Sequence, residues 1–408
     1  MRILIATVTA GAGHLAAAAA LDEAWRDFRP DDVVERLDVV KYFSPLHRKI
    51  HADGYVKLVE HAPEIWGMMF GKTDAPKVAE RLKRLRRVFP SKSRMRFIKH
   101  VKDFNADVVL CTHYVPFEAL DIIKEECSKP QGRRRSRGNG EGSWAGITSR
   151  APLVASIVTD FEAHALWMAC CVDVYFVAAE ETKARLVARG AAPDRVIATG
   201  IPISGRFSAR PDPKGVRRTM GLRDDSPVIL VLSGGFGMGP VAEILSGLDK
   251  VTQPFQTVVV TGRNEELRRK LSAQDRTHPT HVLGFSTNMH ELMAVAELII
   301  SKPGGLTSSE ALAVGRPLFI VNPIPGQEAA NSDFLLERGA AAKVNRVEDL
   351  PYRIGQLLGT KKLTDMARAA KALGRPDAAR AICAEVARRA TAAVAATTHS
   401  TENTVERQ

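Results

Sequence analysis

Residues 299–331 constrain the fold of this 408-residue chain more than any other stretch. A short apolar run ends there, the triplet Pro303-Gly304-Gly305 interrupts it, and residues 307–314 continue with helical character. A strand that leads through a glycine turn directly into a helix is typical of parallel α/β sheets. The N-terminus of such a helix presents unpaired backbone N–H groups, which favour binding of an anion such as phosphate.

A second strand and a polar loop follow this turn. The apolar run at residues 318–321 predicts another buried strand, and it leads into a loop that contains Gln327, Glu328 and Asn331. Phosphate-binding and hydroxyl-binding groups are therefore expected at adjacent strand ends, where open parallel sheets bind their ligands.

Short apolar runs alternate with helical segments in both halves of the chain, which predicts two doubly wound parallel α/β sheets. The glycine and proline content of residues 200–213 is typical of a connection between domains. The predicted strands are 2–8, 33–40, 106–111, 153–158, 172–177, 196–199, 228–232, 257–261, 281–284, 298–301 and 318–321.

The domain boundaries follow from this pattern. We expect an N-terminal domain at residues 1–200 and a C-terminal domain at 201–360, followed by helices at 361–393 and a polar tail at 394–408. Residues 128–150 are rich in glycine, serine and arginine without periodicity, so they are expected to form a disordered insertion.

Two glycine-rich turns follow predicted strands outside the opening stretch. The first strand leads into Gly11, Gly13 and His14, which do not match the dinucleotide-binding pattern GxGxxG. The strand at residues 228–232 leads into a turn that contains Ser233, Gly234, Gly235 and Gly237. Two such turns in the C-terminal sheet favour binding of an anion such as phosphate over two tight connections.

The net charge of +12 indicates an anionic partner. Much of this positive charge lies in residues 77–102, which contain many basic side chains and a single acid, Glu80. This segment follows an aromatic and Met-rich segment at residues 42–70. One interpretation is a solvated helix face, and the other is contact with an anionic membrane surface. The second interpretation assigns membrane or acceptor contacts to Tyr55, Trp66, Arg84 and Arg87.

The cysteines and the hydropathy of the sequence indicate where in the cell the protein is located. The five cysteines show no CxxC spacing, which favours a reduced, cytoplasmic protein without a zinc site. The best candidate for a membrane span, residues 165–179, is interrupted by Asp173. We therefore expect a cytoplasmic protein attached peripherally to the cytoplasmic membrane.

Six motifs together resemble the diacylglycerol glycosyltransferases, which include monogalactosyldiacylglycerol synthases and processive diacylglycerol glucosyltransferases. They are GAGH, VTDFEAH, SGGFG, GFSTNM, PGGLTSSEAL and PGQEAAN. The resemblance runs from residue 1 to about residue 358, except for 128–150. It implies a GT-B fold, in which two Rossmann-like domains face each other across a cleft. The C-terminal domain would hold the sugar nucleotide and the N-terminal domain the lipid acceptor.

The resemblance also assigns donor-binding roles. Glu310 would accept hydrogen bonds from the ribose, Phe285 would cover the uracil unless it is a core residue, and Gln327 and Glu328 would bind the sugar hydroxyls with support from Asn331. The pyrophosphate and base would further contact Met289, Gly304, Gly305, Leu306 and Thr307.

Transfer of the sugar requires a base that removes the proton of the acceptor hydroxyl. His14 stands at the end of the first strand and is the first candidate. Asp160 and His164 stand at another strand end, so either one is an alternative base or an orienting group for the acceptor. The glycine turn at Gly11 and Gly13 would face the acceptor.

The expected reaction moves glucose or galactose from a UDP-sugar to diacylglycerol. One base and no protein nucleophile would invert an α-linked donor to a β-glycoside. No DxD motif stands at a strand end, so we expect neither a metal nor another cofactor. Two alternatives are a UDP-sugar epimerase and a transferase for another lipid-linked acceptor, such as a peptidoglycan precursor. A nucleic-acid-binding protein is disfavoured, because the charge is local and lacks interleaved base-stacking aromatics.

Overall fold

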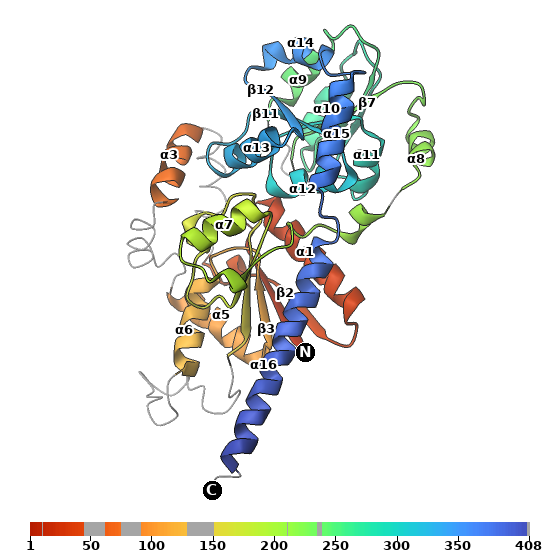
Figure 1. Ribbon diagram of the computed structural model, residues 1–408. Coiled ribbons are helices and arrows are strands. Elements are labelled where there is room, and N and C mark those ends of the chain that lie inside the picture. Colours follow the sequence, from red (N-terminus) through yellow and green to blue (C-terminus); the bar gives the residue numbers. More distant parts are fainter. Residues whose placement is uncertain are drawn as a thin grey trace.

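The computed structural model describes residues 1–9, 11–44, 62–74, 91–128, 151–209, 211–234 and 239–405. Two domains, each built on a six-stranded parallel sheet with helices on both faces, stack end to end (Figure 1). The predicted α/β class with two sheets is confirmed. The predicted insertion lies almost wholly outside the described residues.

The N-terminal sheet has the strand order β2-β1-β3-β4-β5-β6, and all of its paired strands are parallel. Its central strands are buried along nearly their whole length, because helices cover both faces. The strands are β1 (Arg2–Thr7), β2 (Val33–Asp38), β3 (Val108–Cys111), β4 (Leu153–Ile157), β5 (Val174–Val177) and β6 (Val196–Ala198). The helices are α1 (Ala12–Phe28), η1 (Val39–Tyr42), α3 (Pro63–Asp74), α5 (Ser91–Asp103), α6 (Phe117–Ser128), η3 (Ala165–Trp167), α7 (Glu180–Ala188) and η4 (Pro193–Arg195).

The C-terminal sheet has the order β12-β11-β10-β7-β8-β9 and is also parallel. The strands are β7 (Val228–Leu232), β8 (Gln256–Val260), β9 (Thr280–Leu283), β10 (Leu298–Ser301), β11 (Leu318–Val321) and β12 (Ala341–Val344). The helices are η5 (Gly205–Ser208), α8 (Pro213–Met220), α9 (Val241–Leu248), α10 (Glu265–Ser272), α11 (Met289–Val295), α12 (Gly305–Val314), α13 (Gln327–Glu337), η6 (Val347–Asp349) and α14 (Leu350–Gly355). Strand β12 was missing from the sequence prediction.

The chain then returns to the N-terminal domain. After α15 (Lys361–Leu373), the long helix α16 (Ala378–Val405) runs along the N-terminal domain beside α1 (Figure 1). Ile382 and Val386 of α16 are fully buried in one cluster with Leu21 and Trp25 of α1. The helix therefore continues through most of the predicted polar tail and joins the two domains a second time.

Apolar packing is continuous across the domain boundary. Phe161 and Ala17 of the N-terminal domain belong to one buried cluster with Leu306 and Phe334 of the C-terminal domain. The rings of Phe161 and Phe334 stack with centroids 4.4 Å apart. The carboxyl ends of both sheets consequently meet at this boundary, where parallel sheets place their ligand sites.

Candidate active site

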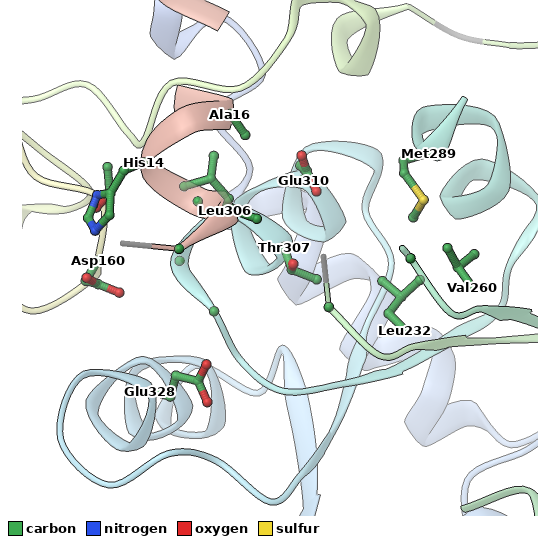
Figure 2. Close-up of a pocket in the computed structure, with 18 of the residues that line it drawn as sticks. His14, Ala16, Asp160, Leu232, Val260, Met289, Leu306, Thr307, Glu310 and Glu328 are labelled. Atoms are coloured by element: carbon green, nitrogen blue, oxygen red, sulfur yellow. The ribbon is translucent and has the colours of Figure 1, made fainter. Parts of the chain in front are cut away.

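A cavity of about 400 Å³ opens between the two domains, and both domains line it (Figure 2). Most of the residues predicted as site residues from the sequence meet there. They are Gly11, Gly13, His14, Asp160, Gly234, Phe285, Met289, Gly304, Gly305, Leu306, Thr307, Glu310, Gln327 and Glu328. Positions separated by about 300 residues in the sequence thus form one site.

Further lining residues did not emerge from the sequence. They are Ala12, Ala16, Thr159, Leu232, Val260, Gly262, Ser286 and Met293. Each of them lies within four residues of a predicted site residue or directly at a strand end. Because ligands bind at the carboxyl ends of parallel strands, the positions of Thr159 and Gly262 after predicted strands could have identified them. Small apolar residues such as Ala16 carry no chemical signal in the sequence.

The remaining predicted residues lie elsewhere. Ser233 is buried and its hydroxyl donates to the carbonyl of Val260 at 2.9 Å, so it supports the turn from behind. His164 and Asn331 are buried outside the cavity lining. Gly235, Gly237, Tyr55, Arg84 and Arg87 lie outside the described residues.

The N-terminus of α12 points into the cavity. Gly304 is its N-cap residue and supplies no side-chain hydrogen bond. The first backbone bond of this helix runs from the amide of Ser308 to the carbonyl of Gly304, at 2.9 Å. The amides of Gly305, Leu306 and Thr307 therefore precede the helical ladder, and the positive end of the helix is available to an anion.

His14 faces this helix from the opposite domain. Its Nδ1 lies 2.8 Å from the carbonyl oxygen of Thr112 and 3.1 Å from the hydroxyl of Thr159. The carbonyl can only accept, so Nδ1 carries the proton and Nε2 keeps a lone pair. Burial among rings, with His113 at 4.8 Å, lowers the pKa of His14 to about 4. The imidazole is therefore neutral at physiological pH.

Three carboxyl groups also border the cavity. Burial raises the pKa of Glu310 to about 8 and raises the pKa of Glu328 and of Asp160 above their ordinary ranges. Opposing this effect, the amide of Asn331 donates to Asp160 at 2.9 Å. Asp160 lies beside His14, while Glu310 lies on the far side of the α12 N-terminus (Figure 2). Carboxyl groups from both domains thus border the site.

Phe285 forms the outer rim of the cavity. Its side chain is 61% exposed, which excludes the alternative of a core phenylalanine. The guanidinium of Arg263 lies 5.4 Å from its ring centroid. An exposed aromatic ring at a cavity mouth is suited to stacking against a planar base.

His164 serves a different purpose from His14. Its Nδ1 accepts from the amide of Leu166, and its Nε2 lies 3.1 Å from the carbonyl of Phe70 and 3.2 Å from the hydroxyl of Thr73. Phe70 and Thr73 belong to α3. The ring therefore fastens α3 to the N-terminal domain and does not reach the cavity.

Helix α3 also touches the polar loop before α13. The indole of Trp66 donates to Oε1 of Gln327 at 3.4 Å. A Cβ atom on Gly67 would lie 2.6 Å from Pro325, and one on Gly326 would lie 2.9 Å from Phe70. One face of α3 thus lies against the loop that carries Gln327 and Glu328.

Two family models match the chain. The model for monogalactosyldiacylglycerol (MGDG) synthase matches residues 14–131 and 146–203, and the model for the glycosyltransferase family 28 C-terminal domain matches residues 228–382. A processive diacylglycerol beta-glucosyltransferase of Bacillus cereus (strain 03BB102) is 28% identical over 93% of this chain and 91% of its own length. The chain is thus similar to diacylglycerol glycosyltransferases along most of its length.

A relative of the same name from Bacillus pumilus (strain SAFR-032) is more similar over a shorter alignment. It is 36% identical over 222 residues, which are 53% of this chain and 58% of the relative. The chain thus spans little more than half the length of that relative.

Solved structures confirm the fold of this chain. Acinetobacter baumannii MurG has a TM-score of 0.56 at 17% identity, covering 95% of this chain and 99% of its own. The S. aureus MnaA–UDP structure has a TM-score of 0.59 at 12% identity, covering 93% and 94%. The expected GT-B arrangement of two Rossmann-like domains is confirmed.

Proposed function

We propose that the protein transfers a hexose from UDP-glucose or UDP-galactose to diacylglycerol and forms a β-glycolipid. The observation that carries this proposal is the meeting of two chemistries in one cavity. The open N-terminus of α12 is suited to a diphosphate, and the neutral imidazole of His14 lines the same cavity from the other domain. The similarity to diacylglycerol glycosyltransferases supports the choice of substrates.

The donor lies along the C-terminal domain in this proposal. The amides of Gly305, Leu306 and Thr307 bind the pyrophosphate, and Phe285 stacks on the uracil. Glu310 binds the ribose hydroxyls. Gln327 and Glu328, at the start of α13, bind the hydroxyls of the hexose.

His14 acts as the base. Its Nε2 takes the proton of the diacylglycerol hydroxyl while the hydroxyl oxygen forms a bond to the anomeric carbon. The bond between that carbon and the UDP oxygen breaks, and UDP leaves with the electron pair. Attack from the face opposite to UDP inverts the configuration. Asp160, beside His14, orients the acceptor hydroxyl.

We further propose that the reaction needs no metal ion. The charge that grows on the leaving UDP is stabilised by the helix N-terminus, whose amides are already oriented. Within the described ranges, no three side chains of His, Cys, Asp or Glu are grouped so as to hold a metal ion. Full turnover after exhaustive chelation is expected, and loss of turnover that Mg²⁺ or Mn²⁺ restores would contradict it.

Helix α3 supports a location at a membrane surface. Its outer face exposes Ile65, Met68 and Met69 at helical spacing. The same helix contacts Gln327 through Trp66. No helix within the described residues is long and apolar enough to cross a membrane. We propose that the protein binds peripherally to the cytoplasmic face of an anionic membrane, where its acceptor resides.

The decisive experiment supplies radiolabelled UDP-glucose and UDP-galactose separately, with diacylglycerol in vesicles, and measures label in extracted lipid. Label from one donor supports the transfer and identifies the hexose. Absence of lipid label with both donors would contradict the proposal. Appearance of an epimerised UDP-sugar in the aqueous phase would instead support the epimerase alternative.

A further inference from the structure

We propose that Asn331 latches the two domains together and positions Asp160, and that it does not contact the donor sugar. The latch stands on geometry alone, whereas the positioning of Asp160 rests on the proposed transfer reaction. The sequence had grouped Asn331 with the sugar-binding residues Gln327 and Glu328, which lie four and three residues before it on α13.

The side chain of Asn331 is fully buried, with 0% exposure. Its Oδ1 accepts from the backbone amide of Phe161 at 2.8 Å. Its Nδ2 donates to Oδ1 of Asp160 at 2.9 Å and to the carbonyl of Pro303 at 3.0 Å. Two partners thus belong to the N-terminal domain and one to the turn that leads into α12.

These partners fix the orientation of the amide. Asp160 and Pro303 present only acceptor oxygens, and Phe161 presents a donor, so a flipped amide would set oxygen against oxygen twice. Both amide protons and the carbonyl oxygen are satisfied in the observed orientation alone. A carboxylate at this position would face two acceptors without a proton to give.

The contacts around Asn331 also cross the domain boundary. Phe334, one turn further along α13, stacks on Phe161. Arg338, directly after α13, forms an ion pair with Glu181 of α7. Asn331 is the buried polar centre of this patch, so its hydrogen bonds to Asp160 and Phe161 exist only when the domains are closed.

Domain closure and the placement of Asp160 are therefore coupled. Asp160 lines the cavity, and the amide of Asn331 holds one of its oxygens. Opening of the domains would release this carboxylate from its position beside His14. The donor domain thus completes the acceptor side of the site, because α13 supplies the group that orients Asp160.

The test uses the full chain with Asn331→Asp. The matched control is Asp333→Asn, which changes an exposed residue of the same helix. Hydrogen exchange of the segments 159–163 and 303–308 is measured by mass spectrometry. Affinities for UDP and UDP-glucose are measured by calorimetry, and kcat and the donor KM by the lipid-labelling assay.

We expect faster exchange of both segments in Asn331→Asp and wild-type exchange in the control. The ratio of UDP-glucose affinity to UDP affinity stays within about twofold, and kcat falls by roughly 10- to 100-fold with little change in the donor KM. Unchanged exchange together with a selective loss of UDP-glucose affinity would overturn the inference and make Asn331 a sugar contact.

A second variant guards against misfolding. Asn331→Ser removes the amide without adding charge, and the same outcomes are expected from it. If the wild-type protein labels no lipid, the proposed function fails. The exchange data and UDP affinities still decide whether Asn331 is a latch, because neither measurement depends on turnover.

Discussion

A Cβ atom on Gly305 would lie 1.9 Å from the carbonyl oxygen of Thr159. Gly305 begins α12 in the C-terminal domain, and Thr159 follows β4 in the N-terminal domain. The glycine turn before α12 in one domain thus touches the strand end that carries Asp160 in the other. Only glycine permits this approach.

Gly305→Ala is therefore expected to prevent full closure of the domains. Overpacking costs about 1–3 kcal/mol, which corresponds to roughly a 5- to 150-fold loss in kcat/KM. Small-angle scattering should give a larger radius of gyration for Gly305→Ala than for the wild-type protein. The adjacent Gly304→Ala is the control for closure, because its added methyl group meets open space. Equal scattering from both variants would contradict the prediction.

His14→Ala is expected to lower kcat by about 10²- to 10⁴-fold, with UDP affinity retained. Because the pKa of His14 is lowered to about 4, its base form persists as the pH falls and is lost only near pH 4. The acid limb of kcat/KM should lie near pH 4, and a limb at pH 6.5 would argue against His14. His164→Gln, whose parent side chain does not line the cavity, should keep kcat within a few-fold once folded protein is isolated.

Glu310→Gln should change stability and binding in opposite directions. The folded-state pKa of Glu310 is raised to about 8, so the folded protein binds more protons than the unfolded chain between its ordinary pKa and 8. The free energy of unfolding consequently falls as pH rises through this window. The Glu310→Gln variant does not lose stability in this way, so its Tm should be higher than that of the wild type at pH 9. At pH 4 this difference in Tm should be absent.

The same variant should bind UDP more weakly, by roughly tenfold, because the ribose hydroxyls then donate to a neutral amide. Calorimetry at pH 8.5 measures this. Unchanged UDP affinity would mean that Glu310 does not contact the ribose.

Helix α3 provides a test of membrane contact. Ile65 and Met68 are 50% and 54% exposed on its outer face. Replacing both with aspartate should reduce co-sedimentation with phosphatidylglycerol vesicles by at least roughly tenfold, because burial of each side chain contributes about 1.5–3 kcal/mol. Glu64→Gln, on an exposed position of the same helix, should bind like wild type. Equal binding of wild type to neutral and anionic vesicles would contradict the electrostatic part of the proposal.

The residue types and apolar runs around α12 made much of the C-terminal part of the site predictable from the sequence. The turn before α12 needs glycine and proline at fixed positions, and the apolar runs around it have the length of buried strands. Strand β12 was missed because Ala341 and Ala342 lack the β-branched character of the other strands. In α16 the sequence predicted a helix, but its return to Leu21 and Trp25 depends on packing between distant segments.

Two parallel sheets and glycine turns at their strand ends could be predicted from the sequence, because the apolar runs and the glycines are local features. Which of Asp160 and His164 lines the cavity depended on the tertiary structure, because the two residues are four positions apart at one strand end. The turn after β4 directs Asp160 into the cavity and His164 toward α3. The tertiary structure also showed that Asn331 differs from Gln327 and Glu328. Closure of the domains buries the side chain of Asn331 and leaves those of Gln327 and Glu328 facing the cavity.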